Sequence, residues 1–189
     1  MRKILIVIDM QNDFIDGSLG TPEAVAIVEN VKAKIREYDP AYVCFTQDTH
    51  EPEYLQTQEG RNLPVEHCIR GTKGWEIRED IWEVVKAFED EKRRVYEENH
   101  LTYRPTYEKP TFGSVELAED LRGLLKDEDI EIEMVGLCTD ICVISNALLL
   151  KAYMPEVKIT VDSSCCAGVT PASHEAALET MKMCQINVV

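Results

Sequence analysis

Cys142 is the residue in this sequence with the clearest potential for covalent chemistry. Apolar patterns predict a strand over Ile130–Leu137 and a helix over residues 141–153. The sulfur of Cys142 is therefore expected in the first turn of a helix that Thr139 or Asp140 could cap. Free backbone N–H groups and the helix dipole favour a thiolate there, and the same groups could stabilise an oxyanion. The pattern predicts a nucleophile, with a buried structural cysteine as the common alternative.

Asp9 and Lys109 are two charged residues next to extended segments. Residues 4–8 form a continuous apolar run, which predicts a strand buried on both faces with Asp9 at its carboxyl end. A carboxylate at that position could take a thiol proton and later protonate a leaving amine. Lys109 precedes Pro110 and is therefore expected in extended backbone. Taken singly, Asp9 could equally be a turn residue and Lys109 a solvated surface lysine.

Asp48, His50 and His67 form a second group with chemical potential. Asp48 and His50 follow a strand predicted over residues 41–46, and His67 lies in a loop-rich stretch over residues 47–75. So long a loop inside a compact domain is usually functional or disordered. Two imidazoles and a carboxylate suit zinc, iron or manganese and leave positions open for water or substrate. We therefore expect one divalent transition metal per chain, although an isolated histidine is more often structural.

The elements that position these residues alternate along the chain. Further helices are predicted over residues 22–36, 77–88, 115–125 and 171–184, further strands over residues 157–161 and 186–189, and a hairpin over residues 94–96 and 101–103. Strands that alternate with helices predict a mainly parallel sheet with helices on both faces. Ligands of such sheets bind beyond the carboxyl ends of the strands. That edge is where Asp9, residues 47–50 and residues 138–142 are expected.

Composition limits the class of protein. The 189 residues fit a single domain over residues 1–189, and the net charge of −15 argues against nucleic acid and anionic membrane surfaces as partners. No stretch approaches the roughly 18 apolar residues of a membrane span. The apolar run at the start is too short for a signal peptide and meets acidic residues at once. Seven cysteines without paired spacing indicate reduced thiols in a cytoplasmic protein.

Three separated motifs point to one family. Residues 9–14 (Asp-Met-Gln-Asn-Asp-Phe), Lys109 and residues 136–143 (Gly-Leu-Cys-Thr-Asp-Ile-Cys-Val) resemble the ordered Asp, Lys, Cys triad of isochorismatase-like cysteine hydrolases. The resemblance runs from Ile4 to the C-terminus. It implies a three-layer α/β/α fold with Rossmann-like topology and a six-stranded, mainly parallel sheet. It also implies a cis peptide between Leu137 and Cys138.

The resemblance further implies roles for individual residues. Asp9, Lys109 and Cys142 would form the catalytic triad, and the backbone amides of Cys138 and Cys142 would form the oxyanion hole. Within the family, the metal residues resemble those of nicotinamidases, in which the metal holds the pyridine nitrogen of the substrate. Those residues are Asp48, His50 and His67, with Glu59 as a fourth ligand.

Substrate contacts are expected from Phe14, Leu137, Tyr107 and Phe112. Nicotinamidases often place an aromatic residue just before the last histidine ligand, where this chain has Leu63-Pro64-Val65. Recognition of the ring would therefore depend on the other aromatic residues.

The expected function is hydrolysis of nicotinamide to nicotinate and ammonia through a thioester on Cys142, as part of pyridine nucleotide biosynthesis. The partner is a small-molecule amide, and a homo-oligomer is expected. One alternative is another amidase or a carbamoyl hydrolase of the same family. A second alternative is a redox or metal-binding protein without catalysis, in which Cys138 and Cys142 form a pair. That alternative leaves Asp9 and Lys109 without a role.

Overall fold

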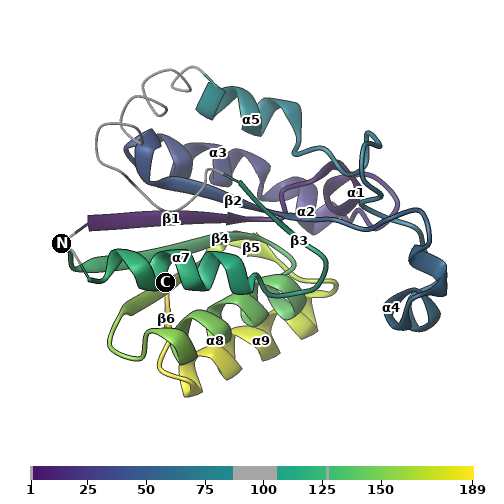
Figure 1. Ribbon diagram of the computed structural model, residues 1–189. Coiled ribbons are helices and arrows are strands. Elements are labelled where there is room, and N and C mark those ends of the chain that lie inside the picture. Colours follow the sequence, from purple (N-terminus) through teal and green to yellow (C-terminus); the bar gives the residue numbers. More distant parts are fainter. Residues whose placement is uncertain (1, 87–105, 127) are drawn as a thin grey trace.

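The computed structural model describes residues 2–86, 106–126 and 128–189 (Figure 1). Six strands form one sheet in the order β3-β2-β1-β4-β5-β6, and every neighbouring pair is parallel. The strands are β1 (Arg2–Ile8), β2 (Val43–Asp48), β3 (Thr106–Lys109), β4 (Ile130–Leu137), β5 (Lys158–Ala167) and β6 (Asn187–Val188). The α/β fold with a six-stranded parallel sheet, expected from the sequence, is confirmed.

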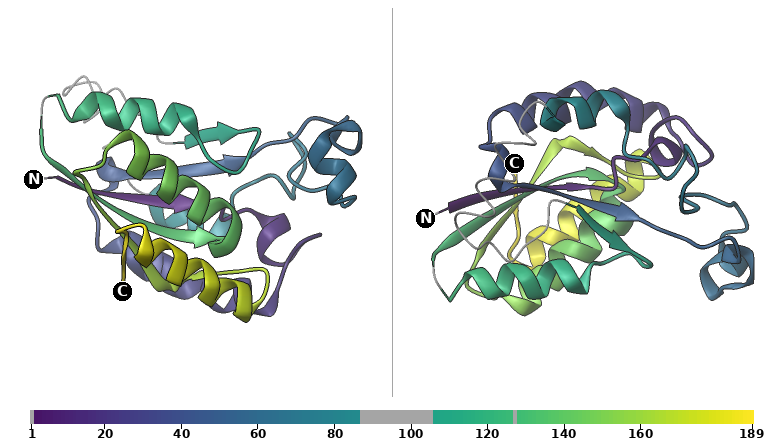
Figure 2. Two further views of the ribbon diagram at one scale, coloured as in Figure 1. Left: turned by 90° about the horizontal axis from the view of Figure 1, so that it is seen from below. Right: turned by 45° about the horizontal axis from the view of Figure 1, so that its top comes forward.

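Helices cover both faces of the sheet (Figures 1 and 2). Successive side chains of a strand point to opposite faces, so Ile4 and Ile6 of β1 join one apolar cluster while Leu5 and Val7 join the other. The Ile4 cluster includes residues of α7 (Val115–Leu124), α8 (Ile144–Tyr153) and α9 (Pro171–Met183). The Leu5 cluster includes residues of α1 (Asn12–Ile15), α2 (Pro22–Ala26), α3 (Val28–Arg36) and α5 (Glu79–Lys86). This arrangement has three layers, as predicted.

Several predicted boundaries differ from those observed. The helix predicted over residues 22–36 is two helices, α2 and α3, which meet at Ile27. β2 begins two residues later than predicted because a 3-10 turn, η1 (Pro40–Tyr42), precedes it. β5 continues well beyond residue 161, to Ala167. The predicted hairpin and the end of the helix predicted over residues 77–88 lie outside the described residues.

The stretch over residues 47–75 contains two short elements, η2 (Tyr54–Gln56) and α4 (Gln58–Asn62). Figure 1 shows them projecting from the carboxyl end of β2, away from the body of the molecule. This projection, residues 51–66, is called the arm below. Among the described residues, no helix is both long enough and apolar enough to cross a bilayer.

Candidate active site

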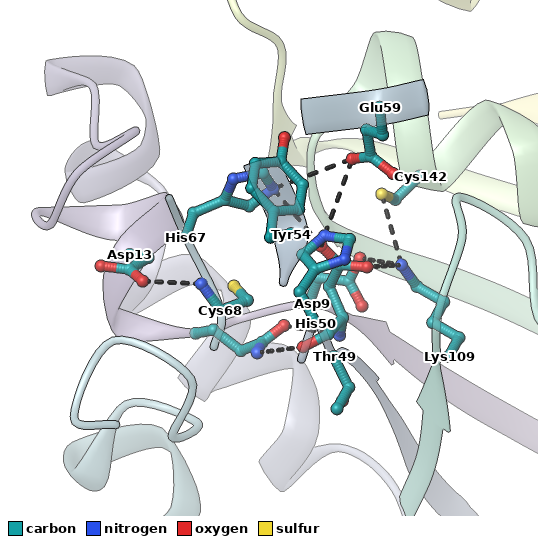
Figure 3. Close-up of polar contacts among 12 residues, drawn as sticks. Asp9, Asp13, Thr49, His50, Tyr54, Glu59, His67, Cys68, Lys109 and Cys142 are labelled. Atoms are coloured by element: carbon teal, nitrogen blue, oxygen red, sulfur yellow. Dashed lines mark hydrogen bonds and ion pairs between the residues drawn. The ribbon is translucent and has the colours of Figure 1, made fainter. Parts of the chain in front are cut away.

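Asp9, Lys109 and Cys142 meet at the carboxyl edge of the sheet (Figure 3). Asp9 directly follows β1, Lys109 is the last residue of β3, and Cys142 lies in η3 (Thr139–Val143), the π-helical turn after β4. The Nζ atom of Lys109 is 2.6 Å from Oδ2 of Asp9 and 3.4 Å from Sγ of Cys142. The three residues are 0%, 1% and 4% exposed, so Lys109 is not a surface lysine.

Burial governs the charges of this triad. Burial raises the pKa of Asp9, although the charge of Lys109 and hydrogen bonds from Lys109 and Thr46 oppose it. Burial and the nearby Asp9 carboxylate raise the pKa of Cys142 well above its ordinary value, against the effect of Lys109. Burial therefore opposes the thiolate that the helix start is expected to favour.

The turn that carries Cys142 differs in detail from the predicted helix start. Cys138 occupies the N-cap position, and neither Thr139 nor Asp140 caps the turn. The Thr139 hydroxyl pairs with His174, and the Asp140 carboxylate accepts from the Val169 amide, so both side chains are engaged elsewhere.

The backbone of this turn carries the two amides that the resemblance assigns to an oxyanion hole. The Leu137–Cys138 peptide is cis, as the resemblance implied. The Cys138 carbonyl accepts hydrogen bonds from the amides of Ile141 and Val143. The first N–H groups of a helix have no acceptor within it. The amides of Cys138 and Cys142 lie at the start of this helical turn.

Asp48, His50 and His67 lie together beside the triad, with ligand atoms within 4.8 Å of one another. The Oδ2 atom of Asp48 is 3.1 Å from Nε2 of His50 and 3.7 Å from Nε2 of His67. Glu59, on α4 of the arm, places Oε1 3.6 Å and 3.9 Å from the same two nitrogen atoms. The four residues predicted to be metal ligands therefore converge, three of them from the strand end and its loop and the fourth from the arm.

The orientation of the two imidazoles suits a metal. Nδ1 of His67 donates to the Val65 carbonyl at 2.8 Å, which leaves Nε2 as the free lone pair. Nε2 of His50 is buried and has no polar partner within hydrogen-bond distance other than the Asp48 carboxylate. Burial alone would raise the pKa of Asp48, but its bond to His50 and the charges of Lys109 and the histidines hold that pKa below its usual value. Two imidazole nitrogens and an ionised carboxylate fit zinc, iron or manganese.

The sequence matches one protein family over nearly its whole length. The family model of the isochorismatase domain matches residues 3–189. The chain belongs to the isochorismatase family. It is 32% identical over 186 residues to an uncharacterised isochorismatase family protein, PncA, of Bacillus subtilis, covering 94% of this chain and 93% of that one. Since the family is hydrolytic, this chain is a hydrolase.

Solved structures of the isochorismatase family show the same architecture. Nicotinamidase PncA from Bacillus subtilis superposes with a TM-score of 0.72 at 29% identity, covering 100% of this chain and 99% of that one. Pyrazinamidase of Pyrococcus horikoshii, crystallised in complex with zinc, gives a TM-score of 0.74 at 24% identity over 100% of this chain and 99% of that one. The similarity to the Pyrococcus horikoshii structure supports the assignment of the fold.

Two residues that position the isochorismatase-family site were not assigned a role from the sequence. The buried amide of Gln11 donates to the Asp48 carbonyl at 2.8 Å and accepts from the Asp48 amide at 2.7 Å, so it fixes the backbone of a metal-site residue. The Asp13 carboxylate accepts from the Cys68 amide at 2.8 Å, next to His67. Both residues belong to the motif of residues 9–14. Membership of that motif was the signal in the sequence that could have pointed to their roles.

The four predicted substrate contacts lie in different surroundings. Phe14 is 8% exposed and its ring centroid is 5.5 Å from that of His67, so it borders the metal site. Leu137 is buried and joined to Cys138 by the cis peptide. Phe112 is 42% exposed on the loop after β3.

Tyr107, the fourth predicted substrate contact, is fully buried. Its side chain is buried in the apolar cluster that includes residues of α7, and its hydroxyl donates to Asp120. On a strand, Tyr107 shares a face with Lys109 but lies two residues further from the carboxyl end. It is therefore part of the core beneath the site.

Proposed function

We propose that this chain is a metal-dependent cysteine amidohydrolase of the nicotinamidase type. The observation that carries the proposal is the juxtaposition of two sets of residues at one sheet edge. Asp9, Lys109 and Cys142 supply acid–base and nucleophilic groups, and the set of Asp48, His50 and His67 lies beside them, with Lys109 3.3 Å from Asp48. Likeness to proteins named nicotinamidase supports the choice of substrate.

The proposed reaction proceeds through an acyl-enzyme. The Asp9 carboxylate takes the proton of the Cys142 thiol as the sulfur attacks the amide carbon. The amides of Cys138 and Cys142 hold the oxyanion, and Asp9 passes its proton to the departing nitrogen, which leaves as ammonia. A water molecule, deprotonated by Asp9, then cleaves the thioester, releasing the acid and restoring the thiol.

We propose that the positive charge of Lys109 favours the formation of the thiolate in these reaction steps. Burial would lower the pKa of the lysine, but Asp9, Cys142 and Asp48 outweigh that effect, so the ammonium keeps its charge. A fixed positive charge 3.4 Å from the sulfur stabilises the thiolate as it forms.

A divalent transition metal would be held by Asp48, His50 and His67, with Glu59 available from the arm. When bound, the metal supplies a Lewis acid that anchors the ring nitrogen of a pyridine or pyrazine amide. Phe14, next to His67, would contact the ring. This arrangement requires the substrate amide to lie between the metal ligands and Cys142.

An ammonia-release assay tests the proposal. Metal-loaded protein should hydrolyse nicotinamide and pyrazinamide much faster than benzamide, which has the ring and the amide but lacks the ring nitrogen. Cys142→Ala should abolish turnover, and Cys184→Ala, which removes an exposed thiol, should retain it. If benzamide is hydrolysed as well as nicotinamide, the proposed role of the metal is wrong. Preference for carbamoyl compounds would favour a carbamoyl hydrolase of the same family.

The cellular setting is part of the proposal. A role in pyridine nucleotide biosynthesis follows from the nicotinate product. A cytoplasmic location is supported by the seven cysteines, all of which are free thiols. We also propose a homo-oligomer, which sedimentation would test.

A further inference from the structure

Asn146 is a buried polar residue for which neither the triad nor the metal set accounts. It lies in the first turn of α8, one helical turn after Cys142, and is 0% exposed. A buried side-chain amide is expected to satisfy its hydrogen bonds within the protein. The partners of Asn146 therefore show what this side chain connects.

The Asn146 amide bonds to two segments at once. Its Nδ2 donates to the carbonyl of Cys142 at 2.8 Å and to the carbonyl of Phe112 at 3.0 Å. Its Oδ1 accepts from the amide of Ser114 at 2.9 Å. Two carbonyls require donors and one N–H requires an acceptor, so these partners fix the orientation of the amide.

The segment contacted on the far side is the loop that follows Lys109. Phe112 and Ser114 lie three and five residues after that lysine, and the Ser114 hydroxyl caps α7 by accepting from the Leu117 amide. The same loop packs closely on α8, since a Cβ atom at Gly113 would lie 3.3 Å from Cδ2 of Leu149. Asn146 thus links the residue that carries the thiol to the segment that carries the ammonium.

We infer that Asn146 is a positioning residue that holds the Cys142 turn and the loop after Lys109 in register, so that the ammonium stays against the sulfur. The inference rests on the proposed function, because it assigns Asn146 to the nucleophile and lysine of that mechanism. Asn146 acts through the backbone and touches neither the sulfur nor the ammonium. Misplacement of catalytic groups by about 1 Å can lower a rate by roughly 100-fold.

Two substitutions separate the two sides of the link. Asn146→Ala removes all three hydrogen bonds. Asn146→Ser retains a hydroxyl that can donate to the carbonyl four residues earlier, that of Cys142, but is too short to reach the loop. Asn187→Ala is the matched control, because it removes a side-chain bond to the Ile159 carbonyl at the far edge of the sheet.

The measurements are the rate at which iodoacetamide labels Cys142 in the folded protein, and kcat and KM for amide hydrolysis. Both Asn146→Ala and Asn146→Ser should lower the Cys142 labelling rate and kcat by about tenfold with little change in KM. Labelling of the exposed Cys184 should not change, and Asn187→Ala should behave as the unmodified protein. If Asn146→Ser labels and turns over normally, or either variant only lowers the melting temperature, the inference is wrong.

A double-mutant cycle with Lys109→Met tests whether Asn146 affects Cys142 through the position of the Lys109 ammonium. If Asn146 acts by keeping the ammonium on the sulfur, Asn146→Ser should have no further effect on Cys142 labelling once the lysine is gone. An undiminished effect in that background would overturn the inference. Labelling needs no substrate, so the result is independent of the substrate assignment. If Cys142 of the unmodified protein is not the preferred site of labelling, it is the proposed function that fails.

Discussion

At the scale of single residues, the ionisation of Asp9 controls the proposed chemistry. The carboxylate must be charged to take the thiol proton, so activity should be lost as the pH falls through the pKa of Asp9 in the folded protein. Burial raises that pKa, and the charge of Lys109 only partly offsets it. The acid limb of the kcat/KM profile should therefore lie above the pH at which an exposed aspartate titrates.

Thr46→Val is a prediction about this ionisation. The Thr46 hydroxyl donates to Oδ1 of Asp9 at 2.6 Å and lowers the carboxyl pKa, so its removal should raise the pKa and move the acid limb to higher pH. Valine has nearly the shape of threonine, which limits changes in packing. Thr180→Val, which removes a hydroxyl bond within α9, is the control and should leave the profile unchanged. An acid limb that stays in place or moves to lower pH would contradict the assignment of Asp9 as the base.

The sequence could predict those site residues that lie at the carboxyl ends of strands. Asp9 and the Cys142 turn each follow a buried apolar strand, Asp48 ends another, and parallel strands bring their carboxyl ends to one edge. The thiol pKa could not be predicted in this way, because it depends on desolvation by the assembled core. The depth of the Tyr107 side chain could not be predicted for a related reason: a strand pattern gives the face of a side chain but not its depth.

At the scale of elements, the approach of β1 to β4 fixes the distance between two catalytic segments. Gly136 of β4 pairs with Ile8 of β1, so the pair lies two residues before Cys138 and one residue before Asp9. Its φ is +116°, and a Cβ atom there would lie 2.1 Å from the Ile8 carbonyl oxygen. No side chain fits without separating the strands.

Gly136→Ala should therefore lower the free energy of unfolding by about 2–5 kcal/mol, combining strain at a positive φ with the clash against the backbone. Gly113→Ala is the matched control, because its nearest neighbour is the flexible end of Leu149 at 3.3 Å, and we expect a loss of about 1 kcal/mol or less. Urea denaturation measures both. Equal stabilities for the two variants would show that the strand approach is not constrained by this glycine.

Sequence patterns could not predict the short elements in the long stretch after β2. Residues 49–75 contain only short helical pieces, stabilised by local caps such as the Thr57 hydroxyl bonded to the Gly60 amide. Periodicity does not reveal elements of three to five residues. The position of Glu59 relative to the histidines depends on this arm, which is why the spacing in sequence left its role open.

At the scale of the whole molecule, the metal set joins distant parts of the chain. Asp48 is the last residue of β2, His50 follows that strand, His67 comes after the arm, and Glu59 lies on the arm itself. A metal bound only by the folded protein stabilises it by mass action, by about 2.7 kcal/mol at a free concentration 100 times Kd. Removal of the metal should lower the melting temperature without abolishing the fold, since the two apolar clusters of the core are built without these ligands.

The same reasoning predicts how this stabilisation depends on pH. Burial would lower the pKa of His50, but its bond to Asp48 and the charges of Asp48 and Glu59 outweigh burial and raise it. Because a metal binds the neutral imidazole, protons compete for Nε2, and the gain in melting temperature on adding zinc should shrink as the pH falls through that raised pKa. His50→Ala and His67→Ala should each abolish the gain, whereas His174→Ala, whose ring instead pairs with Thr139, should keep it. Calorimetry with metal analysis measures both quantities on one sample. A metal content below about one-tenth equivalent after reloading would rule out the site.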